Sequence, residues 1–89
     1  MNPELQSLRA QVDAVDAQIV DLLASRFRIT AQIGQLKAAH ALNAVDPARE
    51  AAQEARFRAL AHELGLKPDL VVRVFRNIID EVVVQHREV

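Results

Sequence analysis

A long helical repeat near the start of the chain constrains the fold more than any other feature of the sequence. Between Leu5 and Leu36 the apolar residues recur at steps of three and four, the period of a helix with one buried face. These residues, here called the apolar seam, are Leu5, Leu8, Val12, Val15, Ile19, Leu22, Ile29, Ile33 and Leu36. Arg26 stands between Leu22 and Ile29, where the repeat calls for an aliphatic residue. Because a charge on a packing face is unfavourable unless a partner or an anion compensates it, Arg26 is a candidate binding residue.

The helix that carries the seam is too long to be covered by its own chain. We predict it from Leu5 to about Ala39, a length of roughly 50 Å. A compact chain of 89 residues has a diameter of roughly 30 Å. A second copy is therefore expected to cover the seam, which makes the protein a homodimer around paired long helices.

Two shorter helices are predicted after a loop from His40 to Val45. Asp46 is a favourable N-cap followed by Pro47 at the first helical position, and Gly65 is a typical stop signal. A third helix follows Pro68. Its predicted buried residues are Val71, Val74, Phe75, Ile78, Ile79 and Val82.

The composition fits an all-α protein and excludes several functional classes. The formal net charge of −1 offers no basic surface for nucleic acid, and the absence of cysteine excludes disulfides and thiolate metal sites. No apolar run approaches the roughly 18 residues of a membrane span, and no signal-peptide segment follows Met1. We expect a cytoplasmic all-α protein with a single domain over residues 1–89, three helices per chain, and neither a nucleic-acid nor a membrane partner.

Two further cations relate to Arg26. Lys37 follows it by almost three full turns, so both lie on one helix face about 16 Å apart along the axis and can bind a small dianion between them. Arg9 lies about 26 Å from Arg26 on another face, so it reaches this site only from a second subunit. The structural alternatives are that Arg26 extends its charged end to solvent or pairs with Asp21 or Glu50, and that Lys37 simply favours the helix C-terminus.

Short motifs follow one another in order over nearly the whole chain. They are Leu8-Arg9, Val12-Asp13, Val15-Asp16, Leu22-Leu23, Arg26, Ile33-Gly34-Gln35-Leu36-Lys37, Asp46-Pro47-Ala48-Arg49-Glu50, Gly65-Leu66-Lys67-Pro68 and Val74-Phe75-Arg76-Asn77-Ile78-Ile79. With their spacings, they resemble the all-helical class of chorismate mutase, the type II family. The resemblance implies an intertwined, domain-swapped homodimer with two identical sites, which isomerises chorismate to prephenate without a cofactor or metal.

The resemblance also implies roles for the three cations of the first helix. Arg26 would bind one carboxylate of the dicarboxylate substrate. Arg9 of the partner subunit would bind the second carboxylate across the dimer interface. Lys37 would contact a carboxylate and the ether oxygen, where negative charge grows as the C–O bond breaks.

The start of the second helix would supply further substrate contacts. By the same resemblance, Glu50 would accept a hydrogen bond from the ring hydroxyl. Asp46 and Arg49 would support the substrate beside it.

Two positions on the third helix depart from the family pattern. Val82 stands where many relatives carry a serine, so one polar contact to the substrate is lost. His86 aligns without gaps to the family's glutamine, the second donor to the ether oxygen, and Gln85 precedes it by one residue. Helical periodicity does not choose between Gln85 and His86, and the continuous alignment favours His86 as the catalytic residue. A solvated or core-edge histidine is the alternative interpretation.

Other functions remain open from the sequence. Isochorismate pyruvate lyase or 4-amino-4-deoxychorismate mutase activity would need a similar scaffold, and Glu50 accepts a hydrogen bond from a hydroxyl or an amine alike. A helical dimerisation or regulatory module is the non-enzymatic alternative, and it would not need Arg26 and Lys37.

Overall fold

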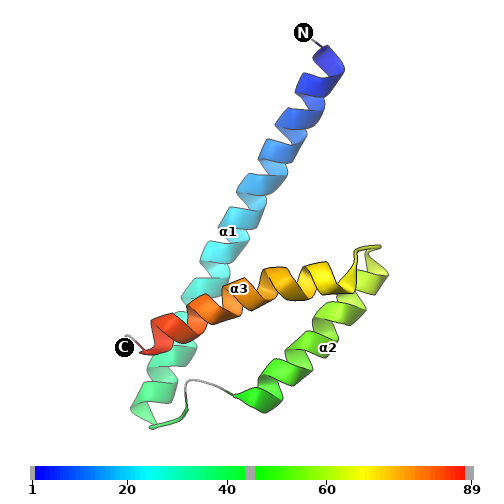
Figure 1. The fold of residues 1–89 in the computed structure, drawn as a ribbon. Helices are drawn as coiled ribbons and strands as arrows, with labels where there is room; N and C mark the ends of the chain where they lie inside the picture. Colours follow the sequence, from blue (N-terminus) through cyan, green and yellow to red (C-terminus); the bar gives the residue numbers. More distant parts are fainter. Residues whose placement is uncertain (1, 44–45, 88–89) are drawn as a thin grey trace. The chain divides into compact units, whose positions relative to one another are not determined.

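Three α-helices make up the part of the chain that the computed structural model describes, residues 2–43 and 46–87. They are α1 (Pro3–Ala39), α2 (Pro47–Glu63) and α3 (Pro68–Arg87) (Figure 1). The predicted all-α fold with one long and two shorter helices is confirmed. Within the described ranges, none of these helices has the length and apolar character needed to cross a bilayer. Residues 44–45 of the predicted loop and Met1 lie outside the described residues.

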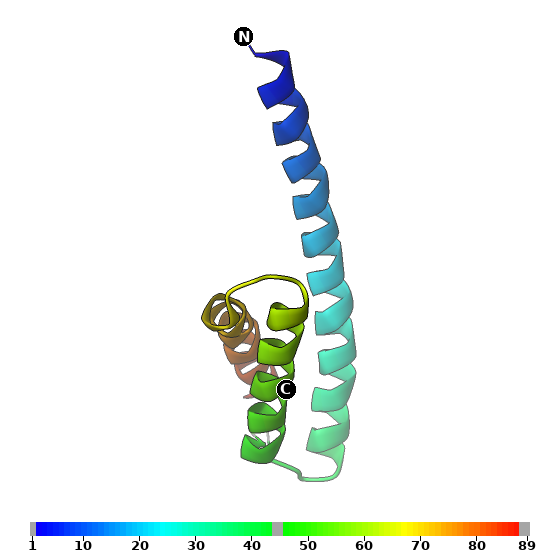
Figure 2. The same ribbon diagram turned by 90° about the vertical axis from the view of Figure 1, so that its right-hand side faces the viewer.

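The long helix α1 is continuous over 37 residues, as Figure 2 shows. It begins at Pro3, slightly before the predicted start at Leu5. The cause is a cap that the sequence analysis did not recognise: the side-chain Oδ1 of Asn2 accepts hydrogen bonds from the amides of Glu4 (2.9 Å) and Leu5 (3.2 Å).

The predicted start of α2 is confirmed. Oδ1 of Asp46 accepts a hydrogen bond from the amide of Arg49 at 3.1 Å, and Pro47 occupies the first helical position, where its missing N–H is not needed.

Helices α1 and α2 end in the same hydrogen-bonding arrangement. After α2, the amide of Leu66 donates to the carbonyl five residues earlier at 2.8 Å, and Gly65 has a φ of 73°. After α1, the amide of Leu42 makes the equivalent bond at 2.7 Å, and Ala41 has a φ of 54°. This is the Schellman motif, whose left-handed residue is usually glycine. The helix α1 therefore ends with an alanine in a conformation that disfavours its side chain.

The chain divides into two compact units, Met1–Thr30 and Ala31–Val89. The first unit consists of the first part of α1, and the second contains the rest of α1 together with α2 and α3. A single helix has no other element of its own unit to pack on. The apolar seam from Leu5 to Ile29 is therefore not covered within the first unit. The single domain over residues 1–89 stays a prediction.

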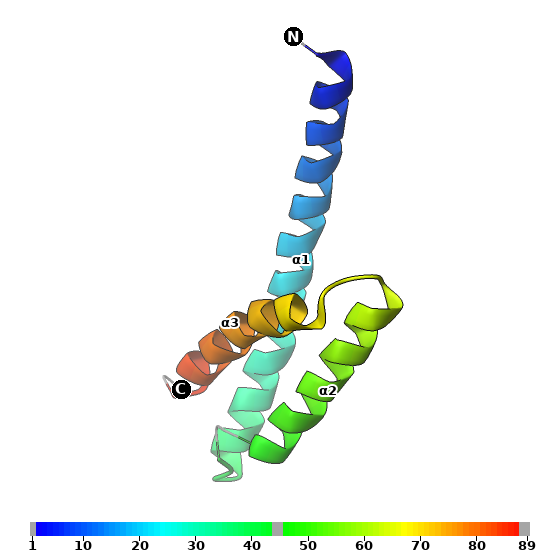
Figure 3. The same ribbon diagram turned by 45° about the vertical axis from the view of Figure 1, so that its right-hand side comes forward.

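The core of the second unit lies between α2 and α3. The rings of Phe57 on α2 and Phe75 on α3 are stacked, with centroids 4.0 Å apart and an angle of 15° between the ring planes. From the short connection between them, α3 runs back alongside α2 (Figure 3). The hydrophobic residues that are buried, among those described, are Phe57, Ala61, Val72 and Val82.

A chain of ion pairs also joins α2 to α3. The guanidinium of Arg58 donates a hydrogen bond to the carboxylate of Asp69 at 2.8 Å, and it lies 3.7 Å from the carboxylate of Glu54. The carboxylate of Glu54 is also 3.9 Å from the guanidinium of Arg76. The hydrogen bond with Arg58 lowers the pKa of Asp69, and the same bond raises the pKa of Arg58. Because these groups are largely exposed, each pair adds little to stability alone.

One prediction for α3 is wrong, since Val74 is 50% exposed rather than buried. Val72 is buried in its place, and residues two apart on a helix lie on nearly opposite sides, so the two valines lie on different flanks of the contact with α2. Val74 belongs instead to an apolar groove of about 370 Å³. This groove is lined by Phe57, Leu60, Ala61, Leu64, Leu66, Leu70, Val71, Val74 and Phe75.

Candidate active site

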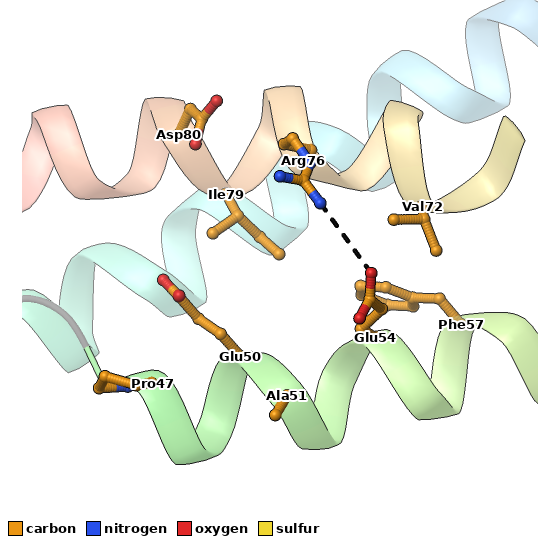
Figure 4. A pocket seen from close by; sticks show the side chains of 9 residues that line it. All are labelled: Pro47, Glu50, Ala51, Glu54, Phe57, Val72, Arg76, Ile79 and Asp80. Atoms are coloured by element: carbon orange, nitrogen blue, oxygen red, sulfur yellow. Dashed lines mark ion pairs between the residues drawn. The ribbon is translucent and has the colours of Figure 1, made fainter. Parts of the chain in front are cut away.

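A cavity of about 310 Å³ lies between α2 and α3, here called the α2–α3 cavity (Figure 4). Its lining residues are Pro47, Glu50, Ala51, Glu54, Phe57, Val72, Arg76, Ile79 and Asp80. Apolar side chains from both helices are combined with a few charged ones, which is the usual make-up of a small-molecule site. In Figure 4, Glu50 and Glu54 project from α2 toward α3.

Carboxylates dominate the charge of the α2–α3 cavity. Glu50, Glu54 and Asp80 contribute negative charge, and Arg76 is the one cation in the lining, 3.9 Å from Glu54. Such a wall favours hydroxyl and amine donors and repels anions. Cations that bind a dicarboxylate must therefore come from outside this lining.

The predicted residues of α2 lie on its first turn. The side chain of Asp46 caps the helix by accepting from the amide of Arg49, and the side chain of Arg49 is exposed. Glu50, one position further on, forms part of the cavity wall. Only Glu50 of these three predicted residues belongs to the cavity lining.

His86 lies against the backbone of α1 at Gly34. An ideal Cβ built on Gly34 would be 2.6 Å from Cδ2 and 3.0 Å from Nε2 of His86, so the imidazole occupies the space that a side chain would take. Lys37 follows Gly34 by one turn and leaves α1 on the same face. The second unit thus brings His86 to the stretch of α1 that carries Lys37.

The other two predicted residues of α3 lie close to His86 in sequence. Val82, one turn before it, is buried, whereas Gln85 and His86 are both half-buried. A valine at this place gives the end of α3 an apolar contact where a serine would offer a hydroxyl.

The remaining predicted cations are in the first unit. Arg9 and Arg26 both lie on α1 within Met1–Thr30. Lys37 and the predicted residues of α2 and α3 belong to the second unit.

Sequence reasoning missed the other three charged residues of the cavity wall, namely Glu54, Arg76 and Asp80. Their signal was the pairing of Glu50 with Glu54 and of Arg76 with Asp80, four residues apart on one helix face in each case.

As for metals, no three His, Cys, Asp or Glu side chains in the described ranges come close enough to hold an ion.

The fold and the site define an all-helical domain that presents charged side chains from helix faces to a small molecule. Residues 8–87 match the family described as chorismate mutase type II, and the chain belongs to this family. The resemblance stated from the sequence motifs is confirmed.

Individual relatives fall into two groups. The chain is 41% identical over 81 residues to a T-protein of Enterobacter agglomerans (91% of this chain, 22% of that protein), and 32% identical over 77 residues to a T-protein of Haemophilus influenzae (86% and 20%). It is 31% identical over 78 residues to a 4-amino-4-deoxychorismate mutase of Streptomyces venezuelae (88% and 76%). The chain thus spans about a fifth of the length of the two T-proteins.

Proposed function

We propose that this chain catalyses the rearrangement of chorismate to prephenate. The observation that carries the proposal is the family match over residues 8–87, which includes all of the predicted site residues from Arg9 to His86. The charge pattern of α1 adds to it, because Arg26 breaks an apolar seam that is otherwise regular.

The proposed reaction makes few chemical demands on the protein. In this pericyclic step the ether C–O bond breaks while a C–C bond forms, and no proton or other group enters or leaves. The protein accelerates it by holding the flexible enolpyruvyl arm over the ring and by stabilising negative charge on the ether oxygen.

The cations of α1 bind the substrate in this proposal. Arg26 binds one carboxylate, and Arg9 of the partner subunit binds the other. Lys37 donates to the ether oxygen. The α2–α3 cavity has three carboxylates against one cation, Arg76, so in this proposal the positive charge that a dianion needs comes from α1.

The side chains of α2 and α3 complete the site. Glu50 accepts a hydrogen bond from the ring hydroxyl, with Asp46 and Arg49 beside it at the start of α2. His86 is the second donor to the ether oxygen. Its contact with Gly34, one turn before Lys37, supports this role for His86 in preference to Gln85.

Two apolar surfaces support an intertwined homodimer. The seam of the first unit has no partner element within that unit, and the apolar groove of the second unit includes Leu64, which is 74% exposed. Both surfaces would be buried if the first part of α1 from one subunit packed on the other subunit. That exchange would also bring Arg9 to the partner's site.

A second candidate substrate is 4-amino-4-deoxychorismate. The relative from Streptomyces venezuelae is named for this substrate and is matched over most of its length. The carboxylates of Glu50, Glu54 and Asp80 would stabilise the positive charge of its amino group better than they would a neutral hydroxyl.

Product identification tests the proposal directly. The purified protein is incubated separately with chorismate, isochorismate and 4-amino-4-deoxychorismate, and the products are identified by NMR. We expect prephenate from chorismate, and much slower formation of prephenate by a Lys37→Met preparation purified in parallel. Pyruvate release from isochorismate would instead identify a lyase. If no substrate turns over and a bicyclic dicarboxylate transition-state analogue does not raise Tm, the chain is a helical interaction module.

A further inference from the structure

We infer that Gly34 is a positioning residue of the reaction, because its missing side chain sets where the imidazole of His86 lies. The inference rests on the proposed function and deepens it. Gly34, inside α1, would determine the position of a hydrogen-bond donor, His86, that comes from α3.

The geometry leaves no space for a side chain at this position. A Cβ on Gly34 would lie 2.6 Å from Cδ2 and 3.0 Å from Nε2 of His86, and atoms of that type do not approach so closely. Gly34 is also the one residue of α1 that is buried among those described. The imidazole and the α1 backbone therefore fit together only because residue 34 is glycine.

The imidazole, and not the helix, would yield to a larger residue. It is the end of a side chain with two rotatable bonds, whereas residue 34 lies inside a continuous helix. Alanine is also the better helix former. The Gly34→Ala protein should therefore fold at least as well as wild type, with its imidazole displaced.

Displacement matters because Lys37 leaves the same face of α1 one turn later. Two donors that share one ether oxygen must both reach it, and a shift of about 1 Å in one of them is enough to slow catalysis. Glutamine, which the family carries at this position, has one more rotatable bond than histidine and can avoid a methyl group at residue 34 more easily. Alanine at residue 34 should therefore be tolerated better with glutamine than with histidine at position 86.

A set of kinetic variants tests the inference. We expect Gly34→Ala to lower kcat roughly tenfold with little change in KM and no loss of Tm. In the His86→Ala background the same substitution should have no further effect on kcat. In the His86→Gln background, compared with His86→Gln alone, it should lower kcat less than it does in wild type, because the longer side chain avoids the methyl group more easily. Gln32→Ala, an exposed change on the opposite side of α1, is the matched control and should leave kcat unchanged.

Two results would overturn the inference. An equal loss of kcat on Gly34→Ala in all three backgrounds would show that Gly34 acts independently of residue 86. A wild-type kcat for Gly34→Ala would show that the contact does not matter for the reaction.

An NMR measurement separates this inference from the proposed function. The chain has three histidines, and His40 and His62 are exposed, so they serve as internal references. Gly34→Ala should shift the imidazole signals of His86, assigned with His86→Gln, and leave the other two in place. If wild type proves inactive, the proposed function fails, and unchanged His86 signals would then refute the contact as well.

Discussion

Lys37 is the single residue on which the proposed chemistry depends most. In the proposed site the arginines would bind carboxylates that carry the same charge before and during the reaction, so they would act mainly on the position of the substrate. Lys37 would face negative charge that grows only in the transition state, and a donor of that kind accounts for a large share of rate acceleration.

Replacing this lysine should therefore remove turnover without removing the fold. We expect Lys37→Met to lower kcat by about a hundredfold or more, with an unchanged helical circular dichroism spectrum. Lys67→Met, a change at the other lysine of the chain, is exposed in the α2–α3 connection and should keep wild-type kcat. Retention of most of the rate by Lys37→Met would contradict the electrostatic account.

The two helix ends provide a matched pair of stability predictions. Ala41→Gly should raise the free energy of unfolding by about 1 kcal/mol, because alanine is strained at a positive φ. Gly65→Ala should lower it by about as much, and only through the backbone, since a Cβ there would meet nothing within 4 Å. Urea denaturation with an unchanged m-value measures both. Destabilisation by Ala41→Gly would argue against the left-handed conformation at this residue.

At the scale of elements, α2 and α3 are joined by aromatic stacking inside and ion pairs outside. The stack of Phe57 on Phe75 is non-polar and does not depend on pH. The pair of Arg58 with Asp69 does, because the carboxylate must be ionised to accept from the guanidinium.

The pKa of Asp69 gives the direction of this dependence. Its pKa is lowered in the folded state by the hydrogen bond from Arg58, so the pair stabilises the fold above the unfolded pKa of about 3.9. That stability is lost as the pH falls through the folded pKa. Asp69→Asn should therefore lower Tm at pH 7 and have little effect near pH 2.

Two controls isolate the ion pair. Glu63→Gln changes an exposed carboxylate at the end of α2, outside the ion-pair chain, and should have little effect at either pH. In an Arg58→Gln background, Asp69→Asn should no longer lower Tm through the ion pair. In the wild-type background, 1 M salt should reduce the loss of Tm that Asp69→Asn causes. An undiminished effect near pH 2 would show that Asp69 acts through something other than its charge.

The sequence predicted the helices well because helix ends are coded locally. The signals at these helix ends are Asp46 with Pro47, Gly65 and Pro68. Each of them acts on the neighbouring backbone, so no tertiary contact was needed to predict it. Ala41 could not be predicted, since alanine carries no turn signal. The exposure of Val74 could not be predicted either. Several apolar positions of α3 fit one helical stripe, and only the packing of α3 on α2 determines which of them are buried.

The candidate site was only partly predictable for a related reason. The family resemblance pointed to Glu50 and His86, but the contact between His86 and Gly34 joins residues 52 positions apart in the sequence. No local pattern encodes such a contact. The i, i+4 pair of Arg76 and Asp80 is visible in the sequence, but that it faces Glu50 and Glu54 across a cavity follows only from the packing of α3 on α2.

At the scale of the whole molecule, the proposed exchange of α1 between subunits makes a testable statement about Arg9. If Arg9 acts on the partner's site, Arg9→Ala and Lys37→Met proteins are each inactive but complement each other. Mixed and allowed to exchange subunits, they should regain roughly a quarter of wild-type activity, because half the dimers are mixed and each has one intact site. If Arg9 acts within its own subunit, every site in the mixture lacks one residue and no activity returns.

The first unit of this chain is a helix and nothing else. A lone amphipathic helix is barely stable in water, so in the proposed dimer it acquires its structure from the second subunit. Dilution should therefore favour unfolding of this protein, and Tm should rise as the protein concentration is increased. In a cell, the amount of chain synthesised would set not only how many molecules there are but also what fraction of them is folded.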